Sequence, residues 1–120
     1  MDKRLIGRWG EQVAGDYLKK KHYKIVAMNF SCRGGEIDLI AENRKYIVFV
    51  EVKLRKNADF AQAKEFVTRA KQERIIQTAS LWLSQNQCEL QPRFDVIEIY
   101  APDGQHSKSI RINHIENAFE

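Results

Sequence analysis

Four charged residues lie inside the two most strand-like runs of this sequence. Glu36 and Asp38 belong to the run GGEIDLIAE, and Glu51 and Lys53 belong to the run YIVFVEVKLR. Charged side chains are rarely fully buried unless they are paired with another charge or bind a metal ion. These four residues are therefore the first candidates for chemistry.

The spacing of these residues places them in pairs on strand faces. Side chains alternate between the two faces of a strand, so Glu36 and Asp38 share one face, as do Glu51 and Lys53. A short polar connection at 42–45 joins the two runs and predicts an antiparallel hairpin. Both pairs can then face the same side, and the pairing register decides whether Asp38 approaches Glu51.

Carboxylates on facing strands suit a divalent cation. Two carboxylates held close together repel each other, and a bound cation removes that repulsion. A site with oxygen ligands alone suits Mg²⁺ or Mn²⁺ better than zinc. Such an ion activates water and polarises a phosphoryl oxygen, and a lysine on the same face can reach the phosphate. Asp38, Glu51 and Lys53 could thus form a site for phosphodiester hydrolysis.

The alternative interpretation is a structural ion pair. Glu51 and Lys53 could take part in ion pairs on an exposed sheet face, worth about 0.2–1 kcal/mol. Apolar residues on both faces of this strand argue against an exposed face, because such strands are normally covered on both sides. The charges follow at the end of the apolar run, where a covered sheet opens. Spacing alone leaves both interpretations open.

The rest of the sequence predicts the elements that must position these charges. Apolar periodicity predicts helices over 4–21 and from about 64 or 68 to 86. Strands are expected over 24–30, 36–42, 46–54, 94–100 and 109–115, with turns at 31–35 and 101–104 and a loop from 57 to about 63. The order α-β-β-β-α-β-β predicts one α/β domain over 1–120, with a mixed sheet flanked by helices.

Composition is that of an ordinary globular protein. Of 120 residues, 43% are hydrophobic and 30% are charged, and the formal net charge of +4 permits nucleic-acid binding without requiring it. The N-terminus has no apolar signal-peptide core, and no run approaches the ~20 apolar residues of a membrane span. Cys32 and Cys88 match no zinc spacing and are expected to be free thiols. We predict a cytoplasmic protein without a membrane segment.

The order of the segments resembles a group of nucleases. Asp38 on one strand, followed by Glu51-Val52-Lys53 at the end of the next, resembles the PD-(D/E)xK nuclease superfamily. The segments GRWGEQVAGDYL, NF, RGGEIDLIAE, IVFVEVKLR and FDVIEI, in this order, more closely resemble the YraN-like uncharacterised family (uncharacterised protein family 0102). That family is considered related to archaeal Holliday-junction resolvases. The resemblance runs almost end to end.

The resemblance implies a restriction-endonuclease-like three-layer fold and a Mg²⁺- or Mn²⁺-dependent endonuclease that cleaves DNA, including branched DNA. Asp38 matches the acidic position of the motif, and Glu51 and Lys53 match its Glu-x-Lys. The backbone carbonyl of Val52 is implied as a further metal ligand. Resolvases of this type act as symmetric dimers, so a homodimer is expected by analogy. The competing function is a non-catalytic nucleic-acid-binding or accessory protein on the same fold.

Glu11 is a candidate from the first helix. Resolvase-like nucleases carry a glutamate on this helix, and Glu11 resembles it as a catalytic residue and metal ligand. Its neighbours one helical turn away, Gly7, Ala14 and Gly15, are small, which would let a sheet edge or a substrate approach. The alternative is a solvated glutamate beside glycines that pack the helix.

Four further residues are additional candidates. Glu36 could ligate the metal or orient a ligand, or it could pair with Arg33 or Arg55. Arg55 could bind phosphate or form a surface salt bridge. Lys71 and Gln72 open the second helix, which resolvase-like folds place near the site. A basic rim could be formed by Arg4, Arg8, Lys19–Lys21, Lys24, Arg69 and Arg74, which are otherwise ordinary solvated charges.

The chain departs from the family pattern at two positions. Leu54 stands where a small polar residue is more usual after the motif's lysine. Ala61 stands where glycine is expected in the following loop. Neither departure touches the acidic residues themselves.

Overall fold

The computed structural model describes residues 3–56 and 67–120, and the side chains among them from Gly7 onward. Its elements are α1 (Lys3–Lys20), β1 (Lys24–Cys32), β2 (Gly35–Glu42), β3 (Tyr46–Arg55), α2 (Arg69–Gln85), β4 (Gln91–Tyr100), the 3₁₀ helix η3 (Gly104–His106) and β5 (Arg111–Phe119). The predicted order α-β-β-β-α-β-β is confirmed. The loop predicted from 57 to about 63, and Ala61 within it, lie outside the described residues.

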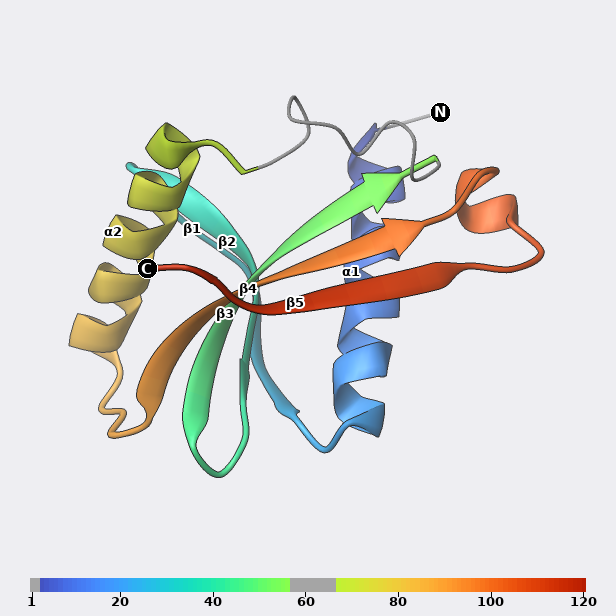
Figure 1. The fold of residues 1–120 in the computed structure, drawn as a ribbon. Coiled ribbons are helices and arrows are strands. Elements are labelled where there is room, and N and C mark those ends of the chain that lie inside the picture. Colours follow the sequence, from blue (N-terminus) through green and yellow to red (C-terminus); the bar gives the residue numbers. More distant parts are fainter. Residues whose placement is uncertain (1–2, 57–66) are drawn as a thin grey trace.

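The strands form one mixed sheet in the order β1-β2-β3-β4-β5. Neighbouring strands are antiparallel except for β3 and β4, which run parallel and are connected through α2. Figure 1 shows α1 against one side of the twisted sheet and α2 against the other. The predicted α/β architecture, a mixed sheet flanked by helices, is therefore confirmed.

The central strand β3 is buried on both of its faces, as its apolar run predicts. Val48 and Val50 belong to the cluster of buried residues that includes Leu18 of α1. Phe49 belongs to the cluster on the opposite face, which includes Trp82 of α2. Leu54, one of the two departures from the family pattern, packs against the cluster on the α1 side. A strand covered by helices on both faces is held firmly, which fixes the position of the charges at its end.

The predicted hairpin of β2 and β3 is confirmed, and its register follows from a tight turn. Asn43 Oδ1 accepts hydrogen bonds from the backbone N–H groups of Lys45 and Tyr46, which closes the turn as asparagine commonly does. The paired residues run from Glu42 opposite Ile47 to Leu39 opposite Val50. Continuing this register by one residue places Asp38 opposite Glu51.

Helix α2 begins where its N-cap dictates. Thr68 Oγ1 accepts a hydrogen bond from the Lys71 backbone N–H at 3.2 Å, so the helix starts at Arg69, next to the later of the two predicted starts, 64 and 68. The expected turn at 31–35 is shorter than predicted, because β1 continues to Cys32 and β2 begins at Gly35. No helix among the described residues is long and apolar enough to cross a membrane.

The last two strands are longer than predicted, because buried polar contacts hold their ends. β4 begins at Gln91, and β5 continues to Phe119, which pairs with Phe94. Asp95 Oδ1 accepts a hydrogen bond from the Asn117 backbone N–H at 3.0 Å. The strand predicted over 109–115 was based on apolar alternation alone. That pattern does not reveal the contact between Asn117 and the buried Asp95, which holds the strand beyond residue 115.

Candidate functional site

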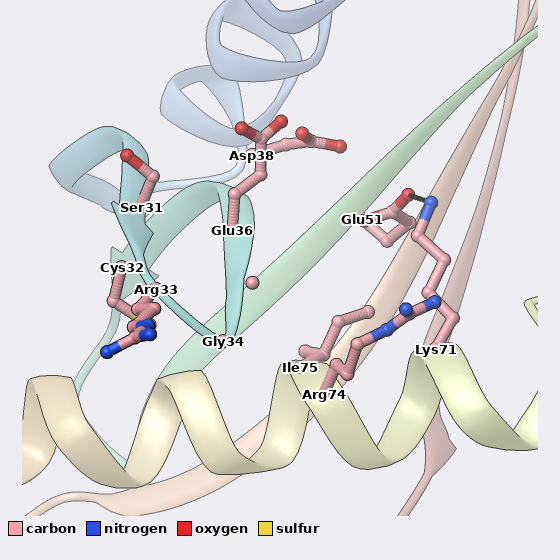
Figure 2. Close-up of a pocket in the computed structure, with 11 residues that line it drawn as sticks. Ser31, Cys32, Arg33, Gly34, Glu36, Asp38, Glu51, Lys71, Arg74 and Ile75 are labelled. Carbon is pink, nitrogen blue, oxygen red and sulfur yellow. Dashed lines mark ion pairs between the residues drawn. The ribbon is translucent and has the colours of Figure 1, made fainter.

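An open cavity of about 480 Å³ lies between the β1–β2 turn and the first half of α2. Figure 2 shows side chains from β2, β3 and α2 that border it. Its lining residues are Ser31, Cys32, Arg33, Gly34, Gly35, Glu36, Asp38, Glu51, Lys71, Arg74 and Ile75. The structure thus brings four sequence candidates to one cavity: Glu36, Asp38, Glu51 and Lys71. The register that the sequence left open thus brings Asp38 and Glu51 to the same cavity.

Asp38 is held by the strand that carries Glu51. Its Oδ2 accepts a hydrogen bond from the Val52 backbone N–H at 2.9 Å. Burial and the neighbouring Glu51 charge raise the pKa of Asp38 to about 7, and Glu11 and Glu36 act in the same direction, against the Val52 hydrogen bond. A carboxyl with such a pKa lies in a strongly electronegative, poorly solvated place.

Glu11 reaches the same region from α1 and is only 9% exposed. Burial raises the pKa of its carboxyl, and the Glu36 and Glu51 charges raise it further, while a side-chain hydrogen bond with Asn29 and the Arg8 charge lower it. Among the described residues, Glu11 Oε1 is a buried oxygen without a hydrogen-bond partner. A buried carboxylate oxygen left unpaired among like charges is costly, and a cation beside it would relieve that cost.

The glycines beside Glu11 are not required for contact with the sheet. A Cβ atom added at Gly7 or Gly15 would meet no atom within 4 Å. The expectation of a close sheet edge is therefore wrong at Gly7 and Gly15, whereas the third small neighbour, Ala14, is fully buried in the cluster between α1 and the sheet. Approach of a substrate remains a prediction.

Glu51 is buried, at 6% exposure, and is paired with two lysines. Its Oε1 lies 2.5 Å from Lys71 Nζ and 3.8 Å from Lys53 Nζ. Figure 2 shows the Glu51 carboxylate turned toward Lys71. The ion pair that the sequence suggested between Glu51 and Lys53 is thus present, but it occurs at a buried carboxylate on the cavity wall.

The two lysines respond differently to this arrangement. Burial lowers the pKa of Lys53, and the charge of Lys71 lowers it further, against the attraction of Glu51. Lys71 also loses solvation, which opposes its charged form. The hydrogen bond and the attraction of Glu51 outweigh that loss, so the pKa of Lys71 is raised. Lys71 is therefore the principal positive charge on Glu51.

The donor chemistry fits a hard divalent cation, although the ligands are not arranged as a complete site. In residues 3–56 and 67–120, no three His, Cys, Asp or Glu side chains form a group that could hold a metal ion. The three oxygen donors Glu11, Asp38 and Glu51 are nevertheless coupled electrostatically. The orphaned Glu11 oxygen and the raised pKa of Asp38 both mark a place where added positive charge is stabilising.

Two of the additional candidates lie apart from this cavity. Arg55 is only 6% exposed, and its Nε donates a hydrogen bond to Glu98 Oε2 at 2.6 Å. Gln72 Nε2 donates to the Val67 carbonyl at 2.9 Å. Arg55, Gln72 and Glu98 line a different cavity of about 290 Å³. Arg55 therefore forms a buried ion pair with Glu98, not a surface salt bridge, and its guanidinium is not exposed for binding phosphate.

Sequence reasoning missed Asn29 and assigned Arg74 only to a basic rim. Asn29 has a positive φ of 53° within β1, and its side chain hydrogen-bonds Glu11. An asparagine inside an apolar strand run was the available signal, because asparagine tolerates this conformation better than most residues. Arg74 lines the cavity with Lys71. Their spacing of three positions on a helix already places them on one face.

The sequence matches the model of a protein family described as uncharacterised protein family UPF0102, over residues 10–99. A UPF0102 protein of Caldanaerobacter subterraneus subsp. tengcongensis is 44% identical over 120 residues, covering 99% of this chain and 98% of the relative. A UPF0102 protein of Geobacter metallireducens is 46% identical, with 96% and 92% covered. A UPF0102 protein of Vibrio campbellii is 43% identical, with 97% and 93% covered.

Proposed function

We propose that this chain, which belongs to uncharacterised protein family UPF0102, is a metal-dependent endonuclease that hydrolyses phosphodiester bonds in DNA. Family membership itself is shown by the match to the family model and by relatives that align over nearly their full length. The activity rests on the cavity and on the resemblance of its residues to PD-(D/E)xK nucleases.

The observation that carries this proposal is the convergence of carboxylates beside a lysine. Asp38 and Glu51 line one cavity, and Glu11 reaches the same electronegative region with an unpaired buried oxygen. Lys53 lies 3.8 Å from Glu51. Carboxyl groups whose pKa is raised by burial and by neighbouring charges, as at Asp38 and Glu11, are typical of functional sites, because folding alone gains little from holding them together.

The residues take the following roles in this proposal. Asp38, Glu51 and Glu11 would hold Mg²⁺ or Mn²⁺, with the Val52 carbonyl as a further ligand. When bound, the cation supplies Lewis-acid polarisation of a phosphoryl oxygen and lowers the pKa of water. The Val52 N–H fixes the orientation of Asp38. The ammonium of Lys53 stabilises negative charge that develops on the phosphate or orients the attacking water.

The charges around the cavity support a nucleic-acid substrate. Arg33, Lys71 and Arg74 line it together with the acidic residues. Basic side chains beside an acidic centre are suited to holding phosphates on either side of a scissile bond. The resemblance to Holliday-junction resolvases adds branched DNA as the substrate class and a homodimer as the active form.

A cleavage assay tests this function. Linear, nicked, flap and four-way-junction DNAs are incubated with Mg²⁺ or Mn²⁺ and the parent protein, Lys53→Ala or Lys45→Ala. Lys45 is an exposed lysine in the β2–β3 turn and serves as the matched control. We expect cleavage by the parent and by Lys45→Ala, and a loss of roughly 10²–10³-fold in Lys53→Ala. Equal cleavage in all lanes, or none in any, would contradict the proposal.

The second candidate is a non-catalytic nucleic-acid-binding or accessory protein. The observation that favours it is the ion pair between Lys71 and Glu51, which neutralises a central carboxylate without a metal. This candidate predicts DNA binding that is independent of Mg²⁺ and Mn²⁺. It also predicts that the DNA remains intact in the same assay.

A further inference from the structure

Lys71 forms an ion pair with Glu51, the same carboxylate that the proposed activity needs as a metal ligand. Glu51 Oε1 lies 2.5 Å from Lys71 Nζ and 3.8 Å from Lys53 Nζ, so two ammonium groups share one oxygen. A divalent cation that binds the same carboxylate adds two further positive charges at this point. Like charges at such distances repel strongly where water is largely excluded.

The structure indicates which lysine can leave. The side chain of Lys71 is 39% exposed, whereas that of Lys53 is 25% exposed. Lys71 extends from a helix that borders the open cavity, as Figure 2 shows. Its side chain can therefore swing into solvent without disturbing the strand that carries Glu51. Its backbone N–H remains fixed by Thr68, so the start of the helix does not depend on the ammonium.

We propose that Lys71 is the resident counter-ion of Glu51 and that it must release this carboxylate before a divalent cation binds. This inference rests on the proposed metal-dependent function and adds a positioning residue to it. Lys71 then sets the metal affinity of the site: it keeps the buried Glu51 compensated in the free protein and competes with the cation for one oxygen.

Calorimetric titration with Mn²⁺, in the absence of DNA, tests this role. The variant Lys71→Met removes the charge and keeps much of the apolar stem, and Lys71→Gln provides a second neutral variant. The matched control is Arg69→Met, which removes a cation from the same helix. Arg69 has an 88% exposed side chain and pairs with Glu73, away from Glu51.

We expect the Kd for Mn²⁺ to fall about tenfold in Lys71→Met and Lys71→Gln, because one competing charge is gone. In Arg69→Met it should stay within about twofold, since an exposed charge is screened. Lys71→Arg keeps a positive charge and should not gain affinity. Binding by the neutral variants but not by the parent would support the competition by Lys71 and would contradict metal binding by the parent, and with it the proposed function.

The contrary results separate the inference from the proposed function. If the parent binds Mn²⁺ and neither neutral variant binds it more tightly, Lys71 does not compete and only the inference is overturned. If neither the parent nor a folded neutral variant binds Mn²⁺ at millimolar concentration, both the inference and the metal-dependent function are overturned. Circular dichroism of each variant establishes that it is folded before titration.

Discussion

Asp38 is the residue whose charge is most strongly shaped by its surroundings. Burial first, and then the charge of Glu51, raise its pKa from 3.8 to about 7. Between about pH 4 and pH 7, the folded state holds a proton that the unfolded state has lost. The free energy of unfolding therefore decreases as the pH rises through this window.

Replacing Asp38 by asparagine should remove this pH dependence. The introduced amide would keep an oxygen that can accept from the Val52 N–H, but it carries no charge. We expect Asp38→Asn to be more stable than the parent at pH 8, by about 2–4 kcal/mol, and nearly equal to it at pH 4. Urea unfolding at both pH values measures this. A constant difference between the two proteins at every pH would contradict the raised pKa.

The sequence predicted the positions of some residues near the site and not of others. Strand alternation and a short hairpin predicted that Asp38 and Glu51 could face the same side, because both rules are local, but the register that brings them to one cavity came from the structure. Arg55 has the same spacing from Lys53 as Lys53 has from Glu51, yet it contacts Glu98 of another strand. A partner 43 positions away in sequence is set by the parallel pairing of β3 with β4, which no local pattern reveals.

The β1–β2 turn forms one wall of the cavity, and its packing against α2 depends on Gly35. A Cβ atom added at Gly35 would lie 2.9 Å from Thr78 Oγ1 and 3.5 Å from the Arg74 carbonyl oxygen. Thr78 cannot yield easily, because it is buried and its hydroxyl donates to that same carbonyl at 2.7 Å. The turn and the helix therefore approach as closely as they do because Gly35 has no side chain.

Gly35→Ala should push the turn away from α2. We expect a loss of about 1–3 kcal/mol in the free energy of unfolding, as is typical of overpacking. Gly34→Ala is the matched control, since a Cβ atom there would meet nothing within 4 Å. Denaturant unfolding of both variants measures the difference. Equal stability of the two variants would show that the turn is not held by this contact.

The junction of β4 and β5 depends on Asp95, which is 0% exposed. Its carboxylate accepts two hydrogen bonds from Arg93 and lies 2.6 Å from His114 Nε2. Burial alone would raise the pKa of Asp95, but the hydrogen bonds with His114, Arg93 and Asn117 outweigh it, so the pKa is lowered. The ionised carboxylate thus stabilises the folded state above the unfolded pKa, and this stabilisation is lost as the pH falls.

Asp95→Asn should destabilise the protein, because it removes the buried carboxylate that Arg93 contacts at 2.9 Å and leaves Arg93, among the described residues, only the more distant carboxylate of the exposed Glu116 at 3.9 Å. We expect a loss of about 3–5 kcal/mol at pH 7, the scale for breaking a buried ion pair. Asp103→Asn, at an exposed turn position, should change stability by less than about 0.5 kcal/mol. Thermal unfolding monitored by circular dichroism compares the two. A small effect at Asp95 would mean that this network contributes little to joining the last strands.

At the scale of the whole molecule, the site is assembled from both helical layers. Glu11 comes from α1 and Lys71 from α2, and these helices lie on opposite sides of the sheet (Figure 1). The element order predicted a sheet between helices. The element order alone does not bring a carboxylate from one layer and a lysine from the other to the end of β3, because that depends on how the helices pack and how the sheet twists. The family resemblance, not the element order, pointed to Glu11 and Lys71.

The central claim is that Asp38 and Glu51 hold a divalent cation, and calorimetric titration with Mn²⁺ tests it most directly. The titration compares the parent with Asp38→Ala and Glu51→Ala, with Glu73→Ala as control for an exposed carboxylate on α2. We predict binding at millimolar or lower Mn²⁺ by the parent and by Glu73→Ala, and its loss in the other two variants. No binding by the parent, or unchanged affinity in Asp38→Ala and Glu51→Ala, would contradict the claim.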